Sequence, residues 1–252
     1  VKRLCQRCIY LEHGTKIMEG PAAELADIYL KRIRASMNEE HLKLEEKDEV
    51  SEENQEKATE SAEQNSVEES ASTSEGDKRE STASNEVHSE YENRKFMEQT
   101  KRFKEGTGEV EFIDFKLFDE NDTETFAFAF DQKMKMRVRI RVNEDQTFGV
   151  AYHIRDDKNM ELLGSSTLRE LGTMIEGKKG EVYEIEMITP LPIIEGNYNI
   201  MLVASRPVIE NRTAMFLSLI ENAAVFAVEE NAKAKLWDKV YLKNEEKKKK
   251  IQ

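Results

Sequence analysis

Met134-Lys135-Met136-Arg137-Val138-Arg139-Ile140-Arg141-Val142 is the stretch that predicts the fold most clearly, because apolar and basic side chains alternate along it without a break. Successive side chains of a β-strand point to opposite faces of the sheet, so this alternation predicts a half-buried strand. The apolar side chains would point into a core. The basic side chains would then form a cationic stripe on the opposite face, made of Lys135, Arg137, Arg139 and Arg141.

Further strands are predicted on both sides of this stretch. One runs from Val110 to Leu117 and changes phase near Ile113, as a β-bulge would produce. Others cover residues 148–154, 183–187, 198–204 and 225–228, with a turn at Asp156-Asp157-Lys158-Asn159. Since turns rather than long helices separate these strands, residues 106–242 are predicted to form a mainly β domain, an antiparallel sandwich with Greek-key or jelly-roll-like connections. The spacing Ile193-x-x-Gly196-x-Tyr198 also predicts a tyrosine corner.

The charge of the chain is concentrated in one segment. The 252 residues include 38 basic and 51 acidic side chains, a net charge of −13. The segment Glu39–Glu92 holds 19 acidic and 5 basic residues, a net of −14, so the rest of the chain nets +1. Such a segment buries too little apolar surface to offset a backbone entropy cost of roughly 1–2 kcal/mol per residue. We therefore predict an acidic disordered linker over residues 36–105, ending at Arg94–Lys104 in a short helical lead-in, with an extended lead-in as the alternative. An acidic interaction tail is the alternative.

Composition also excludes several classes of protein. No apolar run approaches the roughly 18 residues needed to span a bilayer. The acidic balance argues against nucleic-acid binding through the phosphate backbone. Two cysteines are too few for a disulfide framework, which favours a reducing, cytosolic setting. Cys5-x-x-Cys8 has zinc or redox spacing, but a single pair on an amphipathic helix favours packing instead. Residues 106–242 show no paired carboxylates, nucleophile elbow or metal-ligand cluster, which disfavours an enzyme.

Residues 1–35 are predicted to form a helix around Cys5 and Cys8, a hairpin around His13, and a second helix from Pro21 to about Arg34. This piece is too short for an independent core, so we expect it to end a larger domain whose coding sequence begins upstream of Val1. Three stretches of this piece together resemble the end of an ABC-transporter ATPase domain. They are Leu4-Cys5, Tyr10-Leu11-Glu12-His13-Gly14-Thr15-Lys16-Ile17-Met18-Glu19-Gly20-Pro21, and Tyr29-Leu30.

That resemblance implies a parent ATPase that uses ATP and Mg²⁺. The phosphate-binding loop, the acidic metal-binding strand end, the signature loop and the switch histidine of that family all lie upstream of such a segment. The chain as given is therefore expected to bind no cofactor and to have no enzymatic activity of its own.

The block after the linker resembles the C-terminal domain of Wzt-type ATPase subunits, which export O-antigen and related polysaccharides. The pattern of that family is Gly-Phe-x-Ile-x-Asp-x-x-Gly-x-x-Leu-Phe-Gly-x-Asn-Thr. This chain matches it from Gly149-Val150 through Ile154-Arg155-Asp156 to Leu163-Gly164-Ser165-Ser166-Thr167, with two extra residues before the isoleucine. A second element appears as Pro190-Leu191-Pro192-Ile193-Ile194-Glu195-Gly196-Asn197-Tyr198. Asn159 replaces the turn glycine, which asparagine tolerates because it adopts left-handed backbone. Ser166 replaces the family asparagine, so a side-chain role there is in doubt.

The resemblance implies that the sandwich recognises a cell-surface polysaccharide or its lipid-linked precursor. It also implies a transmembrane permease as partner, a homodimer, and a cytoplasmic location at the inner face of the cell membrane. The cationic stripe would suit an anionic glycan, and His153 and Arg155 could join it. An ordinary solvated strand face is the alternative for the stripe. A dimerisation sandwich that binds no sugar is the alternative function.

Two features near the C-terminus complete the sequence. Trp237 is the single tryptophan, and a packing role is favoured over stacking on a sugar. The tail 243–252 contains Lys247–Lys250, which an anionic membrane surface would attract, although a solvated tail is the default.

Overall fold

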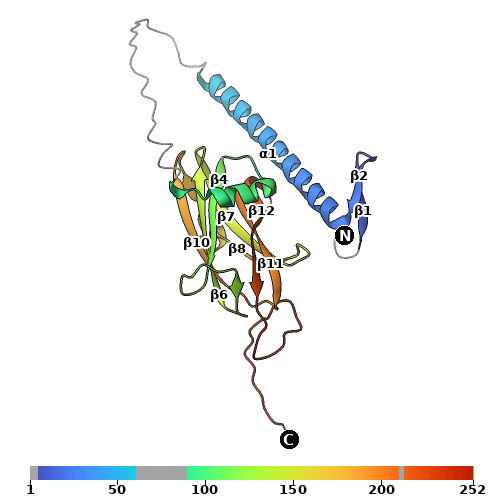
Figure 1. The fold of residues 1–252 in the computed structure, drawn as a ribbon. Coiled ribbons are helices and arrows are strands. Elements are labelled where there is room, and N and C mark those ends of the chain that lie inside the picture. The colour runs from blue at the N-terminus through green and yellow to red at the C-terminus, as the bar shows by residue number, and fades with distance from the viewer. Residues whose placement is uncertain (1–4, 61–89, 210–212, 252) are drawn as a thin grey trace.

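Residues 106–242 contain the predicted antiparallel sandwich, two β-sheets packed face to face (Figure 1). The computed structural model describes residues 5–60, 90–209 and 213–251. One sheet has three strands in the order β10-β6-β4, which span Val182–Pro190, Lys133–Val142 and Val110–Phe118. The predicted strands at 148–154, 198–204 and 225–228 all belong to the other sheet.

That sheet has seven strands. Its main path is β3-β12-β11-β7-β8, with bounds Lys104–Glu105, Thr213–Val228, Gly196–Ile209, Gln146–Arg155 and Glu161–Ser166. Two short strands lie off this path: β5 (Ala127–Phe128) pairs with β12 in parallel, and β9 (Ile175–Gly177) pairs with β7. A short helix α4 (Thr167–Leu171) follows β8 directly. The sequence prediction missed β5, β8, β9, α4 and all of β12 before Val225, because they are too short or too evenly apolar to show a clear period.

The core lies between the two sheets. The apolar residues of β6 are at most 1% exposed, and those of β7 pack against them from the opposite sheet. Fully burying one such side chain stabilises the fold by about 1.5–3 kcal/mol. The pairing of β4 with β6 shifts register between Phe112 and Asp114, which confirms the predicted bulge near Ile113. The Tyr198 hydroxyl donates to the carbonyl oxygen of Ile194 at 2.5 Å, which confirms the tyrosine corner.

The N-terminal piece differs from the prediction. Cys8 lies in strand β1 (Arg7–Glu12) and not in a helix, and β1 pairs with β2 (Thr15–Pro21) in an antiparallel hairpin. Helix α1 begins directly after Pro21, at Ala22, and continues to Glu60 rather than ending near Arg34. Within the described residues, Cys5 and Cys8 are free thiols, and no group of three or more His, Cys, Asp or Glu could hold a metal ion.

The length of α1 corrects the prediction of disorder for residues 36–60. No glycine or proline interrupts the chain between Pro21 and Gly76, and the helix contacts the hairpin and strand β12. Asn38 and His41, beyond the predicted helix end, are buried. An isolated acidic helix would be marginal, but tertiary contacts of one face stabilise it. Residues 61–89 of the predicted linker lie outside the described residues.

The predicted lead-in before the sandwich is confirmed as helix. Helix α3 (Arg94–Thr100) continues into a 3₁₀ turn at Lys101–Phe103 and then into β3. The Asn93 side chain accepts from the Phe96 amide at 3.1 Å and so caps the helix. Phe96 is buried against Phe115, which fixes this segment to the sandwich. Among the described helices, none combines the length and the apolarity that a bilayer span requires.

Candidate functional site

The predicted cationic stripe points outward as expected, but its charges are neutralised. Strand β6 is the middle strand of the three-stranded sheet, so carboxylates of both neighbours face it. Arg139 Nε lies 2.7 Å from Glu184 of β10, and its Nη1 lies 3.7 Å from Asp114 of β4. The other three cations also have carboxylate partners, some of them outside the two neighbouring strands: Arg137 with Glu186, Arg141 with Glu92 and Glu111, and Lys135 with Asp122. This face is therefore a ladder of ion pairs and not a free cationic surface.

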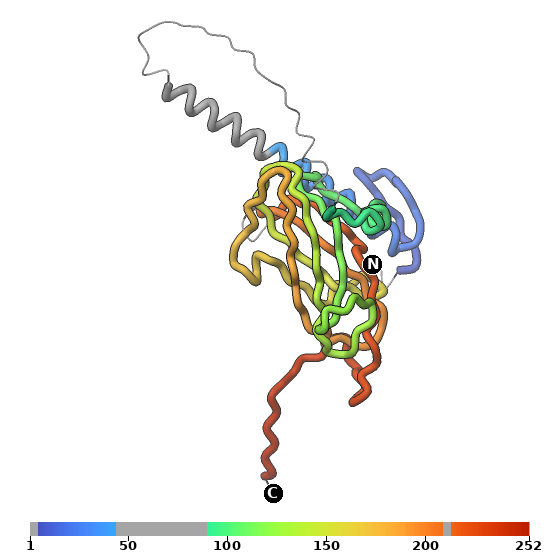
Figure 2. The backbone as a smooth tube through the Cα atoms, turned by 60° about the vertical axis from the view of Figure 1, so that its left-hand side comes forward, coloured from blue at the N-terminus to red at the C-terminus, as the bar shows by residue number. Residues whose placement is uncertain are grey.

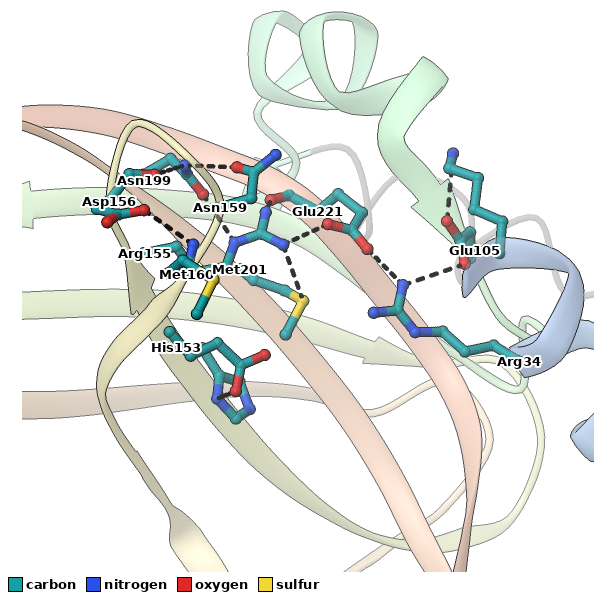
Figure 3. A network of polar contacts seen from close by, with 12 residues as sticks. Arg34, Glu105, His153, Arg155, Asp156, Asn159, Met160, Asn199, Met201 and Glu221 are labelled. Atoms are coloured by element: carbon teal, nitrogen blue, oxygen red, sulfur yellow. Dashed lines mark hydrogen bonds and ion pairs between the residues drawn. The ribbon is translucent and has the colours of Figure 1, made fainter. Parts of the chain in front are cut away.

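His153 and Arg155 lie on the other side of the sandwich. Their neighbours in β7, Tyr152 and Ile154, point into the core, so both polar side chains point to the outer face of the seven-stranded sheet. The six predicted site residues are thus divided between two opposite faces and do not form one site. Arg155 is also only 5% exposed, because it is built into a polar network with Asn199 and Glu221 (Figure 3).

Two hollows meet at β8. A cleft of about 510 Å³ opens between the two sheets, where β8 and β10 are the edge strands. Its walls include core-facing Tyr152, Leu163 and Met187, and polar groups of β8 and α4 line its rim. A second hollow of about 390 Å³ lies on the outer face of β7 and β8. We call six of the polar side chains that line the two hollows the β8 site: His153, Glu161, Ser165, Ser166, Arg169 and Glu170.

Local sequence explains why α4 carries two of these groups. The Ser166 hydroxyl accepts from the Arg169 amide at 3.2 Å and caps the helix, and Gly172 ends it in left-handed backbone with a φ of 72°. The Ser166 that replaces the family asparagine thus has a structural role as helix cap. The short helix holds Arg169 beside both hollows.

The charges of the β8 site are mixed. His153 Nδ1 lies 3.4 Å from Glu161 Oε2, and the hydrogen bond from His153 holds the pKa of the Glu161 carboxyl below its usual value. The Ser165 hydroxyl donates to Glu170. In the part of the chain that the structure describes, the Arg169 guanidinium has no ion-pair or hydrogen-bond partner. A site of this kind offers donors, acceptors and one unpaired cation to a polar ligand.

Sequence reasoning identified one member of the β8 site, His153. The other five members, Glu161, Ser165, Ser166, Arg169 and Glu170, were missed as site residues, although the family pattern ends at Ser165-Ser166-Thr167. Their position at a free sheet edge follows from strand order, which the sequence alone does not show. Trp237, for which packing was predicted, is instead 84% exposed, in the segment between β12 and residues 239–241, whose backbone bonds to Pro192 and Ile194. The C-terminal tail after this segment extends away from the sandwich (Figure 2). The ammonium nitrogen of Lys235 lies 4.9 Å from the centroid of the Trp237 ring.

Comparison with known proteins places this fold. A family model described as the Wzt C-terminal domain matches residues 101–237. Among solved structures, the crystal structure of the C-terminal domain of wzt matches with a TM-score of 0.52 and 14% identity over 58% of this chain and 87% of that chain. A Niemann-Pick type C2 protein from Japanese carpenter ant has a TM-score of 0.34 and 11% identity over 50% of this chain and 98% of that chain. None of the curated proteins compared with this chain matches it. Because the family match covers more than half of its residues, the chain belongs to the Wzt C-terminal domain family.

Proposed function

We propose that this chain is the substrate-recognition part of the ATP-binding subunit of an ABC transporter that exports lipid-linked cell-surface polysaccharide. In this proposal the sandwich binds the glycan, and the β1–β2 hairpin and the start of α1 end the ATPase domain. The subunit would work as a dimer at the inner face of the cell membrane, bound to a transmembrane permease. ATP and Mg²⁺ would bind residues upstream of this chain.

The single observation that supports the β8 site as the glycan site is the unpaired Arg169 between two hollows. The basic residues of β6 already have carboxylate partners, so binding an anion there would require breaking ion pairs. Arg169 needs no such exchange, and its planar guanidinium suits an acidic group or neighbouring hydroxyls of a sugar. His153, Glu161 and Ser165 add donors and acceptors beside it. The apolar walls of the cleft suit the faces of sugar rings.

Titration of the full chain with polysaccharide released from the cell surface of its source tests this proposal. Arg169→Ala should weaken binding about tenfold or more, since hydrogen bonds to a charged group contribute about 1.5–3 kcal/mol. Arg139→Ala is the matched control on the opposite face and should leave the affinity unchanged. Equal losses in both variants, or no saturable binding of the wild-type chain, would contradict the proposal.

A dimerisation module that binds no sugar is the second candidate. It is favoured by three exposed apolar side chains around the edge of the sandwich, Leu168, Leu171 and Ile188, which are 44%, 68% and 58% exposed. Sedimentation of the full chain separates the candidates. A pure dimerisation module should dissociate when Leu171→Asp and Ile188→Asp are combined, and it should show no response to polysaccharide.

A further inference from the structure

Helix α1 is fastened to the outer face of the seven-stranded sheet by polar contacts at its middle. The Asn38 side chain donates to the carbonyl oxygen of Phe216 and accepts from the amide of Phe216, each at 3.0 Å. One turn earlier, the Arg34 guanidinium pairs with Glu221 of β12 and lies 3.7 Å from Glu105 of β3 (Figure 3). Helix α1 follows directly on the ATPase-like β1–β2 hairpin. These contacts therefore join that helix to the sheet that carries the β8 site.

Glu221 connects this helix to strand β7. Its carboxylate binds Arg34 through one oxygen and Arg155 through the other, and Arg155 also donates to the backbone carbonyl of Glu221. Arg155 and the Glu221 side chain are 5% and 13% exposed. Burial alone would raise the pKa of the Glu221 carboxyl, but hydrogen bonds from the two arginines outweigh it and lower the pKa. A shared, largely buried carboxylate makes the position of each arginine depend on the other.

Arg155 also stabilises the turn between β7 and β8, through hydrogen bonds that pass by Asn199. Its Nε donates to Asn199 Oδ1 at 2.9 Å. The Asn199 amide donates to Asn159 Oδ1 at 3.1 Å and to the carbonyl oxygen of Asp156 at 3.4 Å. Figure 3 shows these side chains in one continuous row from α1 to the turn. Glu161 begins β8 immediately after this turn and faces His153 of the β8 site.

We propose that the row of polar contacts Arg34–Glu221–Arg155–Asn199–Asn159 couples the docking of α1 to the conformation of the β7–β8 turn. The docked helix then stabilises the closed turn, and the closed turn stabilises the docked helix. When α1 leaves the sheet, Glu221 loses one of two cationic partners, and Arg155 gains freedom to release Asn199. By thermodynamic reciprocity, a change in the turn alters the docking of α1 by the same factor. That this coupling reports glycan binding to the ATPase side rests on the function proposed above.

Hydrogen exchange in the full chain measures the coupling without any ligand. Two sets of amides are followed: those of α1 around Asn38, and those of Lys158, Asn159 and Met160, which bond to Asp156 in the closed turn. Arg34→Ala should accelerate exchange in both sets, by about fivefold, the lower end of ordinary coupling. Asn199→Ala removes the contact between Arg155 and Asn159, so it should accelerate exchange in α1 as well as in the turn.

Arg32→Ala is the matched control. Arg32 lies on the same helix, but its guanidinium pairs with Glu12 at 3.1 Å and stacks on Tyr10 of the β1–β2 hairpin. This variant should leave exchange in the turn unchanged. Faster exchange confined to α1 in Arg34→Ala, or confined to the turn in Asn199→Ala, would overturn the coupling.

Polysaccharide titration separates this proposal from the glycan function. If the wild-type chain binds the polysaccharide, Arg34→Ala should weaken binding about fivefold although Arg34 lies outside the β8 site. Unchanged affinity in Arg34→Ala would overturn the coupling as a regulator of that site. If the wild-type chain does not bind, the glycan function fails, and the exchange data alone confirm or overturn the link between α1 and the turn.

Discussion

Asn38 and Phe216 are 178 residues apart in sequence, yet the side chain of one forms two reciprocal 3.0 Å hydrogen bonds with the backbone of the other. The two bonds reproduce the pattern of a paired strand residue. Strand β3 pairs with β12 only at Leu219 and Ile220, and beyond it the Thr107 amide donates to the Phe216 carbonyl at 3.2 Å. Asn38 shares that carbonyl and accepts from the Phe216 amide, so a single asparagine on α1 satisfies this edge of β12 and positions the helix.

Asn38→Ala should lower the free energy of unfolding of the docked helix by about 1–3 kcal/mol, because it leaves the Phe216 amide without its acceptor. Asn38→Asp should also cost stability, since a carboxylate cannot donate to the Phe216 carbonyl and would place a negative charge beside it. Hydrogen exchange of the α1 amides measures both effects. Glu39→Ala, at the neighbouring exposed position, is the control and should be close to wild type.

Tyr198→Phe should reduce the stability of the sandwich by about 0.5–1.5 kcal/mol, measured by urea unfolding. The change removes only the hydroxyl that binds the Ile194 carbonyl, and the ring keeps its contact with Phe226 at 5.7 Å. Burial raises the pKa of Tyr198 to about 12, so this hydroxyl stays protonated across the working range of pH. Tyr29→Phe, at an exposed ring on α1, should have a smaller effect. Equal effects would argue against the tyrosine corner as a stabilising contact.

The docking of α1 should weaken in acid. The folded pKa of Glu221 is lowered from its usual 4.5, so the stability contributed by its ion pairs is fully present above about pH 4.5. It is lost as the pH falls below that value through the folded pKa. Exchange of the α1 amides in wild type, expressed relative to the intrinsic exchange rate at each pH, should rise over this interval. Glu221→Gln should show fast exchange at every pH with a flatter profile, whereas identical profiles would exclude Glu221 as the responsible group.

Gly106→Ala and Gly108→Ala separate backbone strain from close packing. Both glycines have positive φ, 120° and 92°, so alanine at either position should cost on the order of 1–2 kcal/mol from strain. A Cβ at Gly106 would also lie 2.5 Å from the Leu217 carbonyl oxygen, whereas a Cβ at Gly108 would meet nothing within 4 Å. Urea unfolding should therefore show a clearly larger loss for Gly106→Ala. Equal losses would mean that the segment can move away from β12 freely.

Much of the sandwich could be predicted from sequence because strand alternation is a local property. The side chains of β6 alternate in the structure as they do in the sequence, and the bulge near Ile113 and the left-handed Asn159, with a φ of 56°, were both visible in the pattern. Helix α1 could not be bounded in the same way. The sequence predicted a helix only as far as about Arg34, because the stability of the helix beyond that point depends on packing partners in β12, which composition does not reveal.

The candidate site was the least predictable part. Four of the predicted residues share one strand and point to one face, as the alternation requires. The charges of Arg137 and Arg139 are balanced by Glu186 and Glu184, which lie on a strand more than 40 residues away and face β6 only because β10 pairs with it. Arg169 lay outside every periodic pattern, and its position beside two hollows depends on β8 being an edge strand.

The sequence by itself determined which side of each predicted strand faces the core and to which family the sandwich belongs, because both follow from covalent geometry and local order along the chain. Only the tertiary structure decided which charges have partners and where α1 lies. Electrostatic attraction and hydrogen bonding fall off over a few ångströms, so they depend on which distant segments the fold brings together. Arg34 and Glu221, 187 residues apart, are the clearest case.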